Sequence, residues 1–166
     1  MAVARVRSSF LKTGTRDKHS GQHDVSYFDS AFIAKFYLDE PESDEVRALA
    51  ERLGRVCCNV FGRLEVASVF HRKWREAAFG EAALKELGAQ FDEDCAAGLW
   101  TWLPISPDLI EVASTAIVRL PKTTFLRSAD TLHLVSAREH GIKEIYSTDR
   151  HLIAAAKHFG VKAMGV

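Results

Sequence analysis

Four acidic residues have the types and the spacing that metal chemistry requires: Asp29, Glu65, Asp130 and Asp149. Asp29 and Asp149 each follow a stretch predicted as a strand, whereas Glu65 and Asp130 each lie near the start of a predicted helix. Strand ends and helix starts meet at one edge of an α/β sheet, so all four could face a single pocket. Crowded carboxylates repel one another unless a cation lies among them, and oxygen ligands select a hard ion such as Mg²⁺ or Mn²⁺. Such a centre is suited to phosphodiester hydrolysis.

Asp29 also has a purely structural explanation. Asp and Ser are common N-cap residues, so Asp29-Ser30 could serve only to begin the helix that follows. The spacing of Phe32, Ile33 and Phe36 predicts that helix. The residue alone does not decide between a cap and a ligand, but three later acids in corresponding places favour a functional role.

The elements that would position these acids alternate between strand and helix. Strands are expected in residues 25–28, 55–60, 99–105, 142–147 and 161–166, with helices in each interval. Strands separated by helices form largely parallel sheets covered on both faces. The pattern therefore predicts an α/β fold with a central, mostly parallel five-stranded sheet flanked by helices.

Two details of this pattern concern aromatic side chains. In the predicted helix 61–78, one face carries Leu64, Ala67, His71 and Trp74 and is expected to form a core or dimer contact. Trp100 and Trp102 alternate along a strand, so they should face the same side, where they could form an interface.

Composition limits the function classes without choosing one. The chain has 166 residues, with 22 basic and 22 acidic side chains, so bulk charge neither requires nor excludes a nucleic-acid partner. Three cysteines form no disulfide framework and indicate a reducing, cytoplasmic location. No apolar run approaches the roughly 20 residues of a membrane span. The length fits one domain.

Residues 1–24 differ from the rest of the chain. They carry five Lys and Arg side chains against two Asp, and from Lys12 onward they are polar throughout. They lack the apolar core of a secretory signal. We expect a loosely ordered leader, with a basic arm that touches RNA as the alternative, and place the folded domain at residues 25–166.

The four acidic stretches, in their order, resemble the four motifs of the PIN-domain family, most closely VapC-type toxins. They are Asp29-Ser30 with Lys35 and Tyr37, Glu65-Val66-Ala67-Ser68, Ser128-Ala129-Asp130-Thr131-Leu132-His133-Leu134, and Ser147-Thr148-Asp149 with Leu152. The resemblance implies a PIN-like three-layer sandwich and a Mg²⁺- or Mn²⁺-dependent ribonuclease. It also implies a homodimer that a small cognate antitoxin holds inactive.

The same resemblance assigns roles. Asp29, Asp130 and Asp149 would bind the metal ion, and Glu65 would act through a water molecule. Ser30 and Thr148 match hydroxyls beside the acids, and Lys35 could balance charge or contact phosphate, with a solvated surface Lys as the alternative. Where relatives often have Ser or Thr at the end of the second strand, this chain has Asn59, which keeps the capacity to hydrogen-bond.

Other side chains near the acids could have either a structural or a functional role. His133 lies one turn after Asp130 and could hydrogen-bond it, but a packed core histidine is the favoured interpretation. His151 could contact substrate. Lys122 and Arg127 precede Asp130 and, with Arg63, Arg72, Lys73 and Arg75, are candidates for a phosphate-tracking surface.

Two rival functions follow from the same residues. A non-catalytic PIN-fold module that binds RNA or protein would need no metal chemistry, although four intact acids argue against it. A phosphoaspartate receiver or a phosphatase fits poorly, because Asp29 is followed by Ser30-Ala31 and not by a second acid.

Overall fold

The computed structural model describes residues 25–166, so the expected leader lies outside the described residues. Within 25–166 there are five strands: β1 (Ser26–Phe28), β2 (Val56–Asn59), β3 (Trp100–Leu103), β4 (Glu144–Tyr146) and β5 (Lys162–Met164). The helices of the same range are α1 (Ser30–Tyr37), α2 (Ser43–Leu53), α3 (Phe61–Arg75), α4 (Glu81–Ala96), α5 (Pro107–Val118), α6 (Ser128–Glu139), α7 (Arg150–Ala155) and the 3₁₀ helix η2 (Ala156–Phe159). Every predicted strand is present, shortened at its ends.

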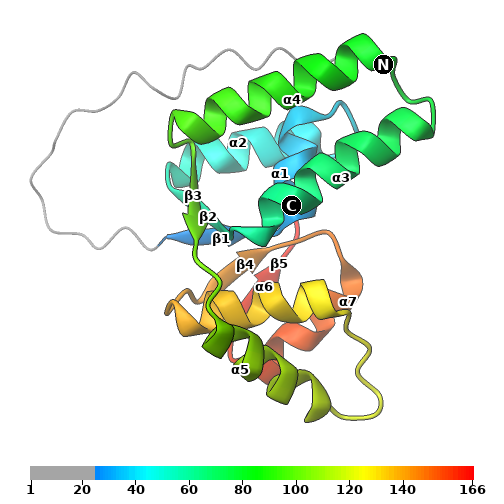
Figure 1. The fold of residues 1–166 in the computed structure, drawn as a ribbon. Helices are drawn as coiled ribbons and strands as arrows, with labels where there is room; N and C mark the ends of the chain where they lie inside the picture. The colour runs from blue at the N-terminus through cyan, green and yellow to red at the C-terminus, as the bar shows by residue number, and fades with distance from the viewer. Residues whose placement is uncertain (1–24) are drawn as a thin grey trace, which may run out of the picture.

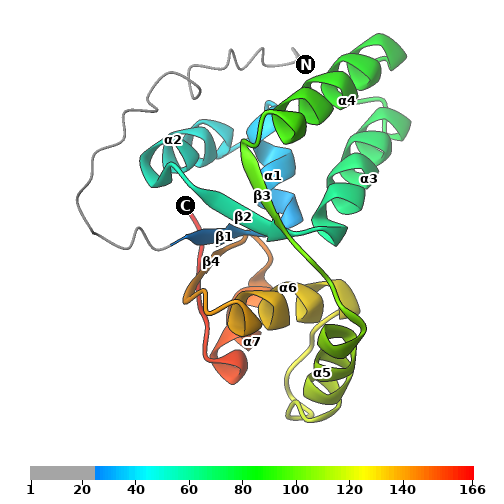
Figure 2. The same cartoon turned by 60° about the vertical axis from the view of Figure 1, so that its left-hand side comes forward.

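The strands form one parallel sheet in the order β3-β2-β1-β4-β5. Helices α1 to α4 lie on one face and α5 to α7 on the other, as both views show (Figures 1 and 2). This confirms the three-layer α/β sandwich, with a sheet that is wholly and not only mostly parallel. Since β1 connects to β2 and β4 connects to β5, the chain diverges between β1 and β4, where parallel sheets open a crevice.

The central strand is buried completely, which explains its apolar sequence. Tyr27 and Phe28 in β1 are wholly inaccessible: Phe28 packs against Phe32 of α1 on one face of the sheet, and Tyr27 packs against His133 of α6 on the other. Phe28 and Phe36 both contact Trp100 of β3. Burying an aromatic side chain stabilises a fold by about 1.5–3 kcal/mol, so this cluster anchors α1 and the residues at its start.

A separate buried polar network ties α1 to α4 and β3. Trp100 Nε1 donates to the Tyr37 hydroxyl at 2.8 Å, which in turn donates to Asp94 Oδ2 at 2.9 Å. Gln90 donates to the other oxygen of Asp94 at 3.1 Å. Burial raises the pKa of the Asp94 carboxyl. This fifth acid is structural, because its oxygens are taken up by the network.

The buried face of α3 is not the one that its sequence predicts. Gly62, Val66 and Phe70 are buried, whereas Leu64 is 61% exposed and His71 is exposed. Gly62 explains why α3 is rotated about its axis relative to the expectation. A Cβ at this position would lie 2.5 Å from Cys58 Sγ, so only glycine allows α3 to approach β2 this closely. The face with Leu64 and Trp74 therefore does not form the core contact that the pattern allowed.

Three smaller expectations have definite outcomes. Trp100 and Trp102 do face the same side, where both pack against α-helical aromatics. All three cysteines are free. Within residues 25–166, no helix has the length and apolar character to cross a membrane.

Candidate metal and nucleic-acid site

Two of the acids leave neighbouring strands at the same edge of the sheet. Asp29 follows β1 directly, and its backbone N–H donates to the carbonyl of Tyr146, the last residue of β4, at 3.0 Å. Asp149 lies three residues beyond Tyr146, at the start of α7. The parallel pairing of Phe28 with Tyr146 therefore places both acids at the crevice between β1 and β4.

The first pair of acids, Asp29 and Glu65, forms the inner side of the site. Asp29 is only 4% exposed, and its Oδ1 accepts the backbone N–H of Phe32 at 2.8 Å. Burial raises the pKa of the Asp29 carboxyl, and the negative charge of Glu65 raises it further. His133, the Ser147 hydroxyl and the Phe32 N–H act in the opposite direction. Asp29 is thus both the N-cap of α1 and an acid held near a second acid, so its two explanations are compatible.

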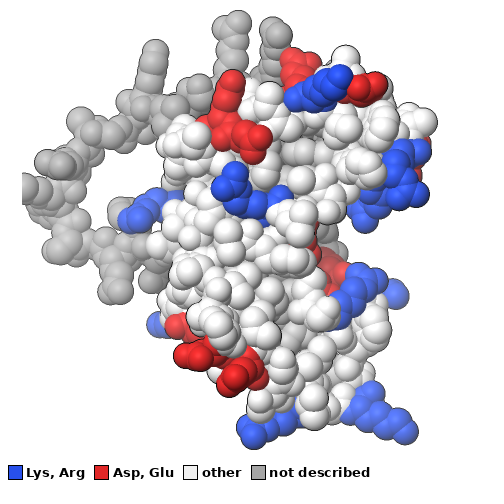
Figure 3. Space-filling view, in the orientation of Figure 1, with Lys and Arg blue, Asp and Glu red and all other residues white. Residues whose placement is uncertain are grey.

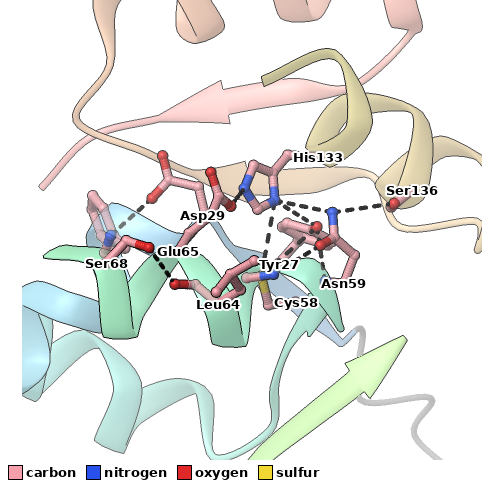
Figure 4. Close-up of polar contacts among 11 residues, drawn as sticks. Tyr27, Asp29, Cys58, Asn59, Leu64, Glu65, Ser68, His133 and Ser136 are labelled. Atoms are coloured by element: carbon pink, nitrogen blue, oxygen red, sulfur yellow. Dashed lines mark hydrogen bonds and ion pairs between the residues drawn. The ribbon is translucent and has the colours of Figure 1, made fainter. Parts of the chain in front are cut away.

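A buried histidine holds Glu65 in place. His133 is 2% exposed, and its Nε2 lies 2.8 Å from Glu65 Oε2. On the other side of the ring, Nδ1 lies 2.8 Å from the Tyr27 hydroxyl (Figure 4). That hydroxyl also accepts the backbone N–H of Asn59 at 2.9 Å. Because a carboxylate can only accept, Nε2 of His133 carries a proton and donates it to Glu65.

Two neighbours complete this network. Burial raises the pKa of Tyr27 well above its ordinary value, so its hydroxyl stays protonated and able to donate. Asn59 caps the start of α3 by accepting the N–H of Gly62 at 3.1 Å, and its Nδ2 lies 3.3 Å from His133 Nδ1 and 3.4 Å from Ser136 Oγ. The expected hydrogen-bonding capacity of Asn59 is therefore used.

The second pair, Asp130 and Asp149, forms the outer side. Asp149 Oδ1 accepts the N–H groups of His151 and Leu152, at 2.6 and 3.1 Å, and so caps α7. Its Oδ2 lies 3.5 Å from Arg127 Nη1. Burial raises the pKa of the Asp130 carboxyl, and the nearby charge of Asp149 raises it further. The Arg127 N–H approaches Asp130 Oδ2 at 3.4 Å, which is a long contact.

The supporting residues predicted from the sequence are placed unevenly. Ser30 is buried next to Asp29 as the first residue of α1. Lys35 is directed to the loop before α2, where its Nζ contacts Glu42 Oε2 at 2.7 Å and the Pro41 carbonyl at 3.0 Å. Its ammonium therefore balances Glu42. Thr148 is exposed.

Ser147 makes the contacts expected of Thr148. Its side chain is fully buried, and its Oγ accepts the Asp149 N–H at 2.9 Å. The same hydroxyl lowers the pKa of Asp29. Both residues lie beyond β4, which ends at Tyr146, so strand alternation in the sequence does not decide which of the two hydroxyls points inward.

The arrangement has the donor chemistry of a divalent-cation site, assembled as two pairs. All four donors are carboxylates, and mutual repulsion contributes to the raised pKa values of Asp29 and Asp130, a cost that a bound cation would relieve. Within residues 25–166, however, no group of three or more acidic, His or Cys side chains is already close enough to hold one ion.

Basic side chains surround this region, although not all those expected from the sequence. Figure 3 shows acidic atoms set into a hollow between the two helical layers, with Lys and Arg above and below. Arg127 is 63% exposed beside Asp149. By contrast, Arg63 lies 3.7 Å from Asp92, and Lys73 pairs with Glu40, so these two are engaged elsewhere.

Comparison with known proteins gives one clear result. The model of the PIN domain family matches residues 26–158, which include all four acids and nearly all of the sheet. No curated protein matches the chain.

Proposed function

Because the chain belongs to the PIN domain family, whose members are commonly nucleases, we propose that it is a metal-dependent endoribonuclease that hydrolyses RNA phosphodiesters. PIN domains generally use divalent metal ions. The observation that carries the proposal is that two pairs of acids, Asp29 with Glu65 and Asp130 with Asp149, are close enough for their charges to interact, with Asp29 and Asp149 at the crevice between β1 and β4.

The residues have distinct proposed roles. Asp29, Asp130 and Asp149 bind Mg²⁺ or Mn²⁺, which when bound stabilises charge on the phosphate and makes water a better nucleophile. Glu65 positions the attacking water and takes its proton. His133 donates to one oxygen of Glu65, so it leaves the other carboxylate oxygen to accept from water. Arg127 and Lys122 hold the flanking phosphates of the RNA.

An RNA cleavage assay with matched variants tests the proposal. Purified protein should cleave a structured RNA when Mg²⁺ or Mn²⁺ is present and should stop when a chelator is added. Asp29→Asn keeps an oxygen to accept the Phe32 N–H, so it should fold while losing at least about 10³-fold in rate, as expected when charge stabilisation is removed. Asp94→Asn, in the distant buried network, is the control and should cleave normally. Undiminished cleavage by Asp29→Asn, or in chelator, contradicts the proposal.

The binding-module alternative has one observation in its favour. Among residues 25–166 the acids stand as two pairs and not as a finished metal-binding group. If the protein retains RNA without cleaving it, and metal ions change neither binding nor stability, the fold serves as a non-catalytic module for RNA or protein.

The likeness of the motifs to VapC-type toxins supports a narrower role. We propose that the protein is the toxin of a toxin–antitoxin pair, with RNA as substrate and a small cognate antitoxin as inhibitor. Expression alone should arrest growth, and Asp29→Asn should abolish the arrest. Growth that is unaffected by an active wild-type enzyme contradicts the toxin role while leaving the nuclease role intact.

An apolar surface supports the proposed homodimer. A groove of about 230 Å³ lies between α5, α6 and the start of α3, and Phe61, Ile110 and Leu132 are among its lining residues. Ile110 is 44% exposed and Leu64, on α3, is 61% exposed. Such patches mark protein–protein contacts. Light scattering should give a dimer for wild type and a monomer for Ile110→Asp, with Val118→Asp, at a more exposed apolar site outside the groove, as the control. A monomeric wild-type protein contradicts the proposed homodimer.

A further inference from the structure

A pair of aromatic rings, the exposed Phe125 and the half-buried His151, lies beside the outer acids and has no part in the core. Phe125 is 57% exposed, although the next residue, Leu126, is buried at 8%. The ring of His151 meets Phe125 edge-on, with centroids 4.9 Å apart and planes at 70°. Exposed Phe side chains are not unusual one at a time, but a Phe held edge-on against a second ring presents its ring face in a fixed orientation.

A guanidinium group covers part of the same ring. Arg127 Cζ lies 5.9 Å from the centroid of Phe125, within the range of a cation–π contact. The same side chain reaches Asp149 Oδ2 at 3.5 Å. Arg127 therefore spans the distance between the aromatic surface and the outer acids, where it could contact a phosphate and a stacked base together.

The aromatic pair is also fixed in position relative to the site. The backbone N–H of His151 donates to Asp149 Oδ1 at 2.6 Å, and Arg150 Nε donates to His151 Nε2 at 3.3 Å. The loop that carries Phe125 is closed by a turn in which the Thr124 N–H donates to the Pro121 carbonyl at 2.8 Å. Both rings are thus held within a few residues of Asp149 and Asp130.

We infer that Phe125 and His151, with Arg127, form a stacking site for the base of an unpaired nucleotide next to the phosphate that is cleaved. This inference rests on the proposed nuclease function and narrows its substrate to single-stranded or looped RNA. Aromatic side chains bind nucleic acids by stacking only on bases that have left a duplex, and Arg supplies the phosphate contact. The exposed ring of Phe125 would stack on the base and Arg127 would contact the phosphate. The nearby acids place both contacts next to the proposed cleavage site.

Binding measured without cleavage tests the inference independently of catalysis. In the Asp29→Asn background, a short single-stranded RNA carrying 2-aminopurine should lose fluorescence on binding, because stacking quenches that base. Phe125→Leu should abolish the quenching and weaken binding by about 5- to 100-fold. Phe125→Tyr should restore both, whereas Val118→Ala, at another exposed apolar position, should change neither. Single-stranded DNA of the same sequence shows whether the sugar also matters.

The outcomes separate this inference from the proposed function. Equal affinities of wild type and Phe125→Leu for single-stranded RNA, unchanged fluorescence, or equal binding of fully paired RNA by wild type would overturn the stacking site. Failure to bind RNA at all would overturn it as well. If cleavage survives Asp29→Asn, the proposed nuclease function fails. The fluorescence result does not depend on cleavage, so the stacking site would still stand. In the active enzyme, Phe125→Leu should raise KM with little change in kcat.

Discussion

The inner and outer pairs of acids are held in different ways. Glu65 is held by a buried histidine whose other nitrogen contacts Tyr27, and Asp29 is held by the start of α1. In the outer pair, Asp149 Oδ1 is held by the start of α7, but its Oδ2 contacts the largely exposed Arg127 side chain at 3.5 Å, and Asp130 Oδ2 contacts the Arg127 backbone N–H at 3.4 Å. The inner pair is therefore held by short contacts before any ligand arrives, whereas Asp130 and one oxygen of Asp149 can adjust. A site that must admit a long polyanion and then close on it has use for both properties.

Among variants that test the difference between the two pairs, a substitution of His133 should have the largest effect on stability and activity. His133→Leu removes both ring nitrogens and leaves Glu65, Tyr27 and Asn59 without their partner in a buried region. The free energy of unfolding should fall by about 2–4 kcal/mol, measured by urea denaturation, and cleavage should slow strongly. His140→Ala, on the exposed end of the same helix, is the control. Unchanged stability would mean that the inner pair is not held as described.

Tyr27→Phe tests the same network one step further from the acid. The ring keeps its packing, but the Asn59 N–H and His133 Nδ1 each lose the hydroxyl. Unfolding free energy should fall by about 1–3 kcal/mol. Since Glu65 keeps its own hydrogen bond, kcat should fall less than for His133→Leu. A larger loss of kcat for Tyr27→Phe would contradict the assigned order of contacts.

Asp130→Asn should separate stability from activity. Burial and Asp149 raise the pKa of Asp130, so the folded protein binds a proton more tightly than the unfolded chain, whose Asp titrates near pH 4. The contribution of Asp130 to stability is therefore fully present below that pH and is lost as the pH rises through the raised pKa. At neutral pH and without divalent ions, removing the charge should stabilise the fold by about 1 kcal/mol, or roughly 2–4 °C in Tm. A lower Tm for Asp130→Asn than for wild type at pH 7 would contradict the predicted stabilisation.

Arg127→Ala should have the smallest effect on stability. An exposed pair at 3.5 Å contributes about 0–1 kcal/mol, so Tm should barely change. Its effect should be on RNA, as a raised KM that depends on salt, and Arg127→Lys should restore only part of it. The exposed Arg119→Ala variant is a charge-matched control. Equal KM values for the two variants would remove the role given to Arg127.

Much of this fold could be predicted from sequence because its signals are local. The position of Asp29 after an apolar strand and of Asp149 after another is enough to place both at the sheet edge. What the sequence could not show depends on the rotation of elements against one another. The face that α3 buries is decided by the close approach of Gly62 to Cys58, and helical spacing alone favoured the opposite face.

The same limit applies within the site. His133 was expected to pair, if at all, with Asp130, its neighbour on the helix, yet its partner is Glu65 on α3. Spacing along a helix predicts contacts within that helix, whereas this contact joins α6 and α3, which lie on opposite faces of the sheet. Ser147 and Thr148 differ by one residue of strand alternation, which the end of a strand leaves undecided.

Calorimetric titration of Mn²⁺ into the metal-free protein tests the central claim most directly, since it asks whether the two pairs hold an ion together. Wild type and Asp94→Asn should bind with the same affinity, and Asp29→Asn and Asp130→Asn, one from each pair, should each weaken binding at least tenfold. No binding by wild type, or binding that either site variant leaves unchanged, would contradict a shared metal centre.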